Sequence, residues 1–224
     1  MLSLHFTNRH GGVGSAPYES FNLATHVGDF PATVGENRIR LSPPEAQPFF
    51  MNQNHGDSIY LVGGDRSQGE PEVDALITQE IGVALVVLVA DCIPLLLWDE
   101  LHGSIAAVHV GRRGLVNGIA SKTVEAMRVL GAKNISASLG PSICGKCYEV
   151  NQDLAAEVVE LFPMAQSLGW RGSPALDLPA ALEQELDKMK VQVLRSEICT
   201  YEDENYFSYR RDGVTGRQAG MISL

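Results

Sequence analysis

The sequence lacks the segments that direct a chain to a membrane or across one. No apolar run reaches about 18 residues, the length that a bilayer-spanning helix needs. The first residues, MLSLHFTNRHGG, contain no basic segment followed by an apolar core, which would mark a secretory signal. These absences predict a cytoplasmic protein with no membrane partner.

Basic residues are scarce and scattered along the chain. The sequence has 17 Lys and Arg against 27 Asp and Glu, which gives a formal charge of −10 at pH 7. A surface for nucleic acid needs basic residues gathered on one face. We therefore expect no nucleic-acid partner, and we expect any bound anion to be small.

Histidine is also sparse, and its spacing argues against two classes of metalloenzyme. The six histidines include no H-x-H pair, so the chain is poorly equipped for a trinuclear copper centre. The segment PSICGKC resembles part of the zinc nucleobase deaminase signature, but no H-x-E occurs to complete it. The sequence therefore excludes that deaminase fold.

The chain contains four cysteines, Cys92, Cys144, Cys147 and Cys199. In a reducing compartment they are expected to be free thiols or metal ligands rather than disulfide partners. Cys144 and Cys147 form a lone C-x-x-C in a loop rather than at a helix start, so we interpret them as structural or loop thiols.

The apolar patterns predict one α/β (α+β) domain over residues 1–224, with mixed β-sheets flanked by helices. Continuous apolar runs rich in β-branched residues predict buried strands at 83–89, 94–98 and 104–110. Apolar residues then recur every three or four positions, which predicts a helix over 115–130. The remaining patterns predict helices over 34–41, 152–162 and 179–190, a strand near the start of the chain, and a turn at RRDG.

Three candidate functional residues occur where apolar runs stop or turn. Cys92 follows the buried strand 83–89, His109 lies near the end of strand 104–110, and His55 lies in the turn NHGD. Adjacent strands would bring Cys92 and His109 to a common sheet edge, and His55 would close a third side.

Spacing alone leaves three interpretations of these residues open. Cys92 can be a small core residue with locally hydrogen-bonded histidines nearby. Cys92 and His109 can form a nucleophile and its base. The three side chains can instead bind a metal and leave one position open, as catalytic zinc sites do, with the pKa of a bound water lowered to about 7.

Beyond these residues, long segments of the sequence resemble the laccase-domain family, whose members were first described as polyphenol oxidases and are now described as purine nucleoside phosphorylases. The matching segments follow the family's order and cover essentially the whole chain: HGGVGSAPYESFNLATHVGDFPATVGENRIRL, NQNHGD, VDALIT, GVALVVLVADCIPLLLWD, IAAVHVGRRGL, LGPSICGKCYEV and FSYRRDGVTGRQAGMISL.

The resemblance implies a zinc site. Its ligands are the histidine of Q-x-H-G, the cysteine of A-D-C and the histidine of A-A-V-H, which are His55, Cys92 and His109 here. It also implies phosphorolysis of adenosine, inosine, guanosine and methylthioadenosine, with phosphate as the second substrate, and deamination of adenosine. Copper is the alternative metal, because the family's earlier description as polyphenol oxidoreductases implies copper-dependent enzymes.

The chain departs from the family at two motifs. Where the family has A-G-W-R-G, Arg112 replaces the tryptophan, which leaves the substrate preference open. The family's loop G-P-x-I-G-x-C-C-Y-E-V has two adjacent cysteines. Here it reads GPSICGKCYEV, with Cys144 and Lys146 as substitutions, so a function that depends on adjacent cysteines does not carry over.

Further residues are assigned roles as hypotheses. Four residues are candidate contacts for substrate or phosphate: Arg113, Arg38, Arg211 and Asp74. Asp74 and Asp91 are also candidate carboxylates behind the metal ligands or acid/base groups. Each has a plainer interpretation, as a solvated arginine or as an aspartate that closes a turn.

Three other functions compete with the phosphorylase. They are a hydrolase of the Cys/His type, a copper-dependent polyphenol oxidoreductase, and a non-catalytic role in which purine activity is incidental.

Overall fold

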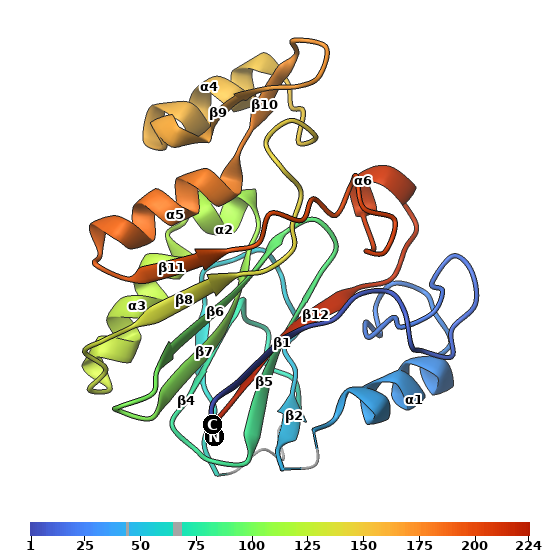
Figure 1. The fold of residues 1–224 in the computed structure, drawn as a ribbon, viewed down its shortest axis with the longest axis vertical. Coiled ribbons are helices and arrows are strands. Elements are labelled where there is room, and N and C mark those ends of the chain that lie inside the picture. Colours follow the sequence, from blue (N-terminus) through green and yellow to red (C-terminus); the bar gives the residue numbers. More distant parts are fainter. Residues whose placement is uncertain (44, 65–68) are drawn as a thin grey trace.

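The computed structural model describes residues 1–43, 45–64 and 69–224, whose strands form two large sheets and one two-stranded sheet (Figure 1). The strands are β1 Ser3–Phe6, β2 Gln47–Phe49, β3 Ile59–Leu61, β4 Ala75–Thr78, β5 Val83–Val89, β6 Ile93–Asp99, β7 Ser104–Val110, β8 Ser136–Leu139, β9 Gln166–Leu168, β10 Pro174–Leu176, β11 Gln192–Arg195 and β12 Gln218–Ser223. The helices are α1 Pro31–Leu41, α2 Arg112–Val116, α3 Ile119–Val129, α4 Gln152–Leu161, α5 Leu178–Lys188 and α6 Tyr209–Asp212, with a 3-10 turn at Pro163–Ala165. The predicted class, α/β with mixed sheets flanked by helices, is confirmed.

The first large sheet has four strands in the order β1-β12-β5-β2. β12 pairs antiparallel with both β1 and β5, while β2 runs parallel to β5. Ser3 pairs with Ser223, so the two ends of the chain lie side by side (Figure 1).

The second large sheet has six strands in the order β11-β8-β6-β7-β4-β3. Its centre is antiparallel, with β6 between β7 and β8, and its two edge strands run parallel to their neighbours. Because β6 and β7 are antiparallel, the start of β6 lies beside the end of β7, and Pro94 pairs with His109.

The two sheets pack face to face, which explains why their strands read as continuous apolar runs. In β5 the odd-numbered residues from Val83 to Val89 enter the core between the sheets, together with Leu96 of β6 and Ile105 of β7. The even-numbered residues of β5 pack on the opposite face, against Leu23 and its neighbours. Each central strand is therefore buried on both sides.

Helices cover the outer face of the six-stranded sheet. Buried residues of α3 and α5 form one core with the residues of β6 and β7 that point away from the other sheet. Farther along the chain, α4 and the β9–β10 hairpin form one end of the molecule (Figure 1). Among the described residues, no helix combines the length and the apolar character needed to cross a bilayer.

Two local predictions were wrong or incomplete, and one element was not predicted. The helix predicted over 115–130 is two helices, α2 and α3, because Gly118 adopts a left-handed φ of 73° between them. The predicted turn RRDG belongs to the short helix α6, whose first turn is capped by the side chain of Ser208 and which ends at Gly213. The β9–β10 hairpin was not predicted.

Candidate functional site

The candidate site lies where the layer between the two sheets ends. Alternation along β7 puts His109 on the same face as Ile105 and Ala107, which belong to the core between the sheets. Cys92 lies in the connection from β5 to β6 and packs against that core. The apolar layer therefore ends in an imidazole and a thiol. These two polar residues follow apolar runs in the sequence because they lie where the buried strands reach the edge of the core.

His55 joins these two residues from the connection between β2 and β3. One donor atom of each of His55, Cys92 and His109 lies within 4.8 Å of the others. The rings of His55 and His109 meet edge to face, with centroids 4.7 Å apart and planes at 84°. His109 is 3% exposed, Cys92 is half-buried and His55 is exposed, so the cluster opens toward solvent on one side.

Gly111 leaves space beside the three side chains. A Cβ atom at this position would lie 3.0 Å from the Cys92 sulfur, 3.3 Å from the His55 ring and 3.9 Å from the His109 ring. The φ of Gly111 is −88°, which any residue adopts, so the backbone does not require glycine here. The absence of a side chain therefore keeps the space between the three donors open.

Asp74 holds two of the three residues in place. Its carboxylate is fully buried and accepts a hydrogen bond from Nδ1 of His109 at 2.7 Å. It also accepts from the backbone amides of Asn54, His55 and Gly56, at 3.2, 3.1 and 2.7 Å. Because Nδ1 of His109 donates to Asp74, its Nε2 is left to face Cys92 and His55, as in the carboxylate-histidine arrangement of zinc sites.

Two residues at the site adopt backbone angles that favour glycine. His55 has a φ of 61° and Asp91, next to Cys92, has a φ of 87°. Asp91 is fixed by hydrogen bonds that its carboxylate accepts from the Thr200 hydroxyl at 2.8 Å and from the Arg210 amide at 2.7 Å. Such strain, of order 1–3 kcal/mol per residue, persists where the surroundings enforce it, as they do at functional sites.

The charges of Cys92 and His109 stabilise each other. Burial opposes the thiolate, but His109 together with hydrogen bonds from His109 and His55 lowers the pKa of Cys92 to about 6. Burial likewise opposes the imidazolium, yet Cys92 and Asp74 raise the pKa of His109 to about 9. Without a metal, the pair is therefore a thiolate and an imidazolium at neutral pH.

The cluster forms a wall shared by two hollows. The larger, of about 420 Å³, contacts all three residues and is also lined by His26, Gln53, Tyr209 and Arg217. The smaller, of about 290 Å³, contacts His55 and Cys92 and is otherwise lined by Arg112, Arg113 and Tyr148. A reactant in either hollow would thus meet His55 and Cys92, and one in the larger hollow would also meet His109.

The donor set suits one divalent metal with an open position. Two imidazoles and one thiolate are ligands that zinc accepts, and a fourth position would face the hollows. A blue-copper centre adds a weak axial ligand to the same donors, most often a methionine and in some proteins a glutamine or a backbone oxygen. The described residues that line the two hollows include no methionine.

Comparison with known proteins gives the family. The family model for multi-copper polyphenol oxidoreductase laccase matches residues 3–224. The chain belongs to this family. It is 45% identical to a purine nucleoside phosphorylase of Streptomyces coelicolor over 98% of this chain and 94% of that protein. It is also 35% identical to the purine nucleoside phosphorylase YfiH of Shigella flexneri, over 97% of this chain and 92% of that protein.

Solved structures have the same fold. A Neisseria meningitidis protein covers 100% of this chain and 94% of its own, with a TM-score of 0.89 at 34% identity. YlmD from Geobacillus stearothermophilus covers 99% and 91% of the two chains, with a TM-score of 0.84 at 32% identity. The two-sheet architecture is therefore shared within the family.

The three arginines proposed as anion contacts lie in different places. Arg113 lines the smaller hollow. Arg38 stacks on Phe50 at 3.8 Å and forms an ion pair with Glu70, and it does not line either hollow. Arg211 donates to the backbone carbonyls of Thr200 and Tyr206 and lines a separate hollow. The structure thus brings only Arg113 of these arginines beside the cluster.

Several lining residues were not singled out as site residues from the sequence. Tyr148, Tyr209 and Arg217 all lie within the family-like segments GPSICGKCYEV and FSYRRDGVTGRQ, which was the available signal. Gln53, two residues before His55, was missed as well. Its side-chain amide exchanges two hydrogen bonds with the backbone of Leu88, at 2.7 and 2.9 Å, and so forms a fixed wall.

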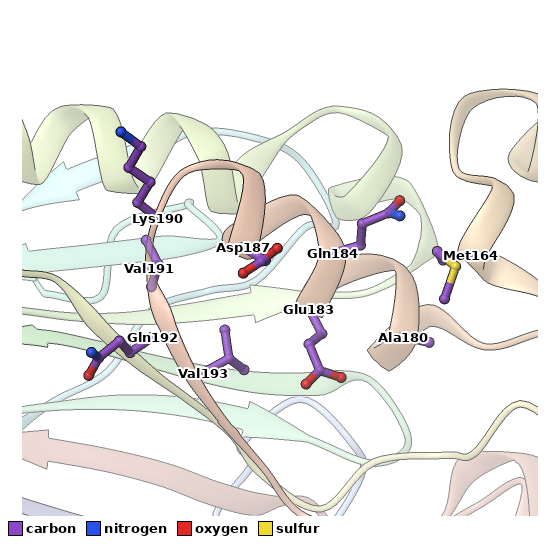
Figure 2. Close-up of a pocket in the computed structure, with 9 residues that line it drawn as sticks. All are labelled: Met164, Ala180, Glu183, Gln184, Asp187, Lys190, Val191, Gln192 and Val193. Atoms are coloured by element: carbon purple, nitrogen blue, oxygen red, sulfur yellow. The ribbon is translucent and has the colours of Figure 1, made fainter.

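A larger hollow lies elsewhere, between α5 and the segment that leads into β11 (Figure 2). It measures about 640 Å³, and its lining includes Glu183, Asp187 and Lys190 but no histidine or cysteine. Volume alone does not make a catalytic site, because the chemistry needs convergent reactive groups. We therefore place the candidate site at the His55, Cys92 and His109 cluster.

Proposed function

We propose that this protein is a zinc-dependent purine nucleoside phosphorylase that also deaminates adenosine. Its substrates would be adenosine, inosine, guanosine and methylthioadenosine, with phosphate as the second substrate of phosphorolysis. One observation carries the proposal: His55, Cys92 and His109 line one hollow, and His55 and Cys92 also line a second, smaller one. Relatives that match nearly the full chain and are named purine nucleoside phosphorylases support it.

The smaller hollow suits phosphate. Arg112 and Arg113 supply guanidinium groups, which bind phosphate oxygens through paired hydrogen bonds. Tyr148 lies beside them, and its burial, followed by the charge of Cys92, raises the pKa of its phenol, so that the phenol stays protonated and donates. In phosphorolysis a phosphate oxygen would attack C1′ of the ribose from this side.

The larger hollow suits the nucleoside. Tyr209 and the rigid side chain of Gln53 offer surfaces for a flat base and its sugar. Burial, with the charges of Arg217 and Arg38, lowers the pKa of His26, so this residue is neutral and can exchange hydrogen bonds with a base. As the C1′–N9 bond breaks, the base would leave with the bonding electron pair and take up a proton.

His55, Cys92 and His109 would hold the zinc, and Asp74 would orient His109 behind it. When bound, the zinc supplies a positive charge that stabilises developing negative charge and lowers the pKa of water. In deamination, water adds to the adenine carbon that bears the amino group, and ammonia leaves to give inosine. Residues of the larger hollow would hold the base in reach for this reaction.

Product analysis tests the proposal. Purified protein is incubated with adenosine with and without phosphate, and the products are separated. Adenine and ribose 1-phosphate that appear only with phosphate indicate phosphorolysis, inosine without phosphate indicates deamination, and hypoxanthine indicates both reactions. No product under either condition would refute the proposal.

Arginine variants test the assignment of the smaller hollow. Arg113→Gln should raise the KM for phosphate about tenfold, because one charge-assisted contact of about 1.5 kcal/mol is lost. Deamination needs no phosphate and should change little. Arg171→Gln, an exposed arginine outside both hollows, is the matched control. Equal effects of both variants would refute the assignment.

A Cys/His hydrolase is the second candidate, favoured by the thiolate and imidazolium that the metal-free pair adopts at neutral pH. Metal analysis separates the two candidates. The phosphorylase requires one equivalent of zinc at the His55, Cys92 and His109 cluster, and Cys92→Ala should contain one equivalent less than wild type. A protein that is active without metal at this cluster and is inactivated by alkylation of Cys92 would support the hydrolase instead. The polyphenol oxidoreductase requires bound copper and oxygen uptake with a phenol.

A further inference from the structure

A second group of metal-type donors lies in two loops that the proposed function does not use. Cys144 and Cys147 belong to the loop between β8 and α4, and Cys199 and Glu202 to the loop between β11 and α6. One donor atom from each of the four lies within 4.8 Å of all the others. Both pairs have the same spacing, with two residues between the donors.

The two loops also have the same local structure. The carbonyl of Cys144 accepts hydrogen bonds from the amides of Cys147 and Tyr148, both at 3.1 Å. The carbonyl of Cys199 likewise accepts from the amides of Glu202 and Asp203, at 3.2 and 2.9 Å. Each pair of donors therefore lies on one tight turn, as in the ligand turns of structural zinc sites.

Backbone contacts hold the two turns against each other. Ser142 and Cys199 form a parallel bridge, and the amide of Thr200 donates to the carbonyl of Ser142 at 3.1 Å. The amide of Cys144 donates to the sulfur of Cys199 at 3.3 Å. A thiol sulfur is a weak acceptor and a thiolate a stronger one, so this amide suits a deprotonated, metal-bound cysteine.

Burial also fits a closed site. Cys147 and Cys199 are each 7% exposed and pack with Ile143, while Cys144 is half-buried and Glu202 is exposed. A tetrahedral zinc with Zn–S bonds of about 2.3 Å places its donors roughly 3.8 Å apart, which lies within the 4.8 Å that bounds the four donor atoms here. One disulfide would use two of the sulfurs and leave the third beside a carboxylate.

We propose that Cys144, Cys147, Cys199 and Glu202 form a second metal site, which binds a zinc-type divalent cation and fastens the two loops together. All four positions are filled by the protein, so the site is structural. It differs in this from the first cluster, which has three donors and faces two hollows.

The loops that this metal joins support the candidate active site. Tyr148, which lines the smaller hollow, follows Cys147 directly. Asp91, which precedes Cys92, accepts from the Thr200 hydroxyl through its carboxylate and from the Ile143 amide through its carbonyl, at 2.8 and 2.9 Å. The second metal would thus fix the position of Tyr148 and brace the connection that carries Cys92.

Metal analysis in a Cys92→Ala background tests the proposal independently of the first cluster. We expect this protein to retain about one equivalent of zinc, and the triple variant Cys92→Ala, Cys144→Ser, Cys199→Ser to retain none. Cobalt loaded into the Cys92→Ala protein should show sulfur-to-cobalt charge-transfer absorption, which the triple variant lacks. Equal metal contents in the two proteins would overturn the proposal, whether or not the first cluster binds zinc.

An exposed ligand provides a variant that does not threaten folding. Glu202→Gln, made in the same Cys92→Ala background, should release zinc to a coloured chelator at least about tenfold faster than its parent, because an anionic ligand is lost. Glu204→Gln, two residues away and also exposed, should release zinc at the parental rate. Identical rates for both variants would remove Glu202 from the ligand set. Two cysteines of this cluster that alkylate only after reduction would identify a disulfide and overturn the proposal.

Discussion

Replacing Asp74 by asparagine tests how the candidate site is held together. The carboxylate accepts from the imidazole of His109 and from three backbone amides. Asparagine has the same shape but turns an N–H group toward these donors. At least one buried donor then loses its partner, and the buried His109 loses its counter-charge, which should lower the free energy of unfolding by about 2–4 kcal/mol.

The same change should weaken metal binding. Asp74 accepts from Nδ1 of His109, which leaves Nε2 unprotonated for a metal. The amide of asparagine can donate to Nδ1 instead and so favour the tautomer whose Nε2 carries a proton. Loss of such a supporting carboxylate typically costs about 10- to 100-fold in metal affinity.

Asp99 provides a matched control far from the site. It is 1% exposed and also accepts from one imidazole, that of His102, and from three backbone amides. Asp99→Asn should therefore lower the melting temperature about as much as Asp74→Asn, by roughly 10 °C for a chain of this length. It should leave zinc affinity, measured by competition with a chelator, unchanged. Equal zinc affinities in the Asp74 and Asp99 variants would refute the role given to Asp74.

Three further predictions follow from the same geometry. In metal-free protein, alkylation of Cys92 by iodoacetamide should follow a titration with a midpoint near pH 6, its lowered pKa, and a midpoint near pH 9 would contradict the pairing with His109. Burial opposes the charge of Asp99, but hydrogen bonds from backbone amides lower its pKa to about 2. Its contribution to the free energy of unfolding is therefore complete above about pH 4 and disappears as the pH falls toward 2. Over that range the difference in this free energy between wild type and Asp99→Asn, measured by urea unfolding, should shrink by about 2 kcal/mol. Gly111→Ala should reduce metal affinity with a small loss of stability, since its methyl group would lie 3.0 Å from the Cys92 sulfur, and unchanged affinity would show that this space is not used.

The central strands were predictable because their apolar runs are long and end abruptly. Residues 83–89 and 104–110 form strands with the predicted bounds, and the strand predicted at 94–98 extends by one residue at each end. Periodicity does not reveal which strands pair, and β12 inserts between β1 and β5 through contacts across most of the chain. Short strands such as β9 and β10, of three residues each, carry too little pattern to stand out.

The candidate site was predictable to the extent that its residues lie in regular elements or motifs. His55, Cys92 and His109 come together as expected from strand ends, and the orienting role of Asp74 follows from its position in the fold. The assembly of Cys144 and Cys147 with Cys199 was not foreseen. A spacing of two residues is visible in a sequence, but the approach of two loops more than 50 residues apart depends on tertiary contacts.

The pairing of the first strand with the last has a consequence for biosynthesis. Of the four strands of this sheet, β1 is synthesised first and β12 last, so Ser3 can pair only after Ser223 has been made. Until then β1 has no strand beside it, and β5 lacks its neighbour on that side. Pairings between such distant segments form slowly and leave sheet edges exposed to other chains in the meantime. This sheet is therefore completed only after residues 218–223 have been made, and nascent chains that stall before residue 218 leave the edges of β1 and β5 unpaired.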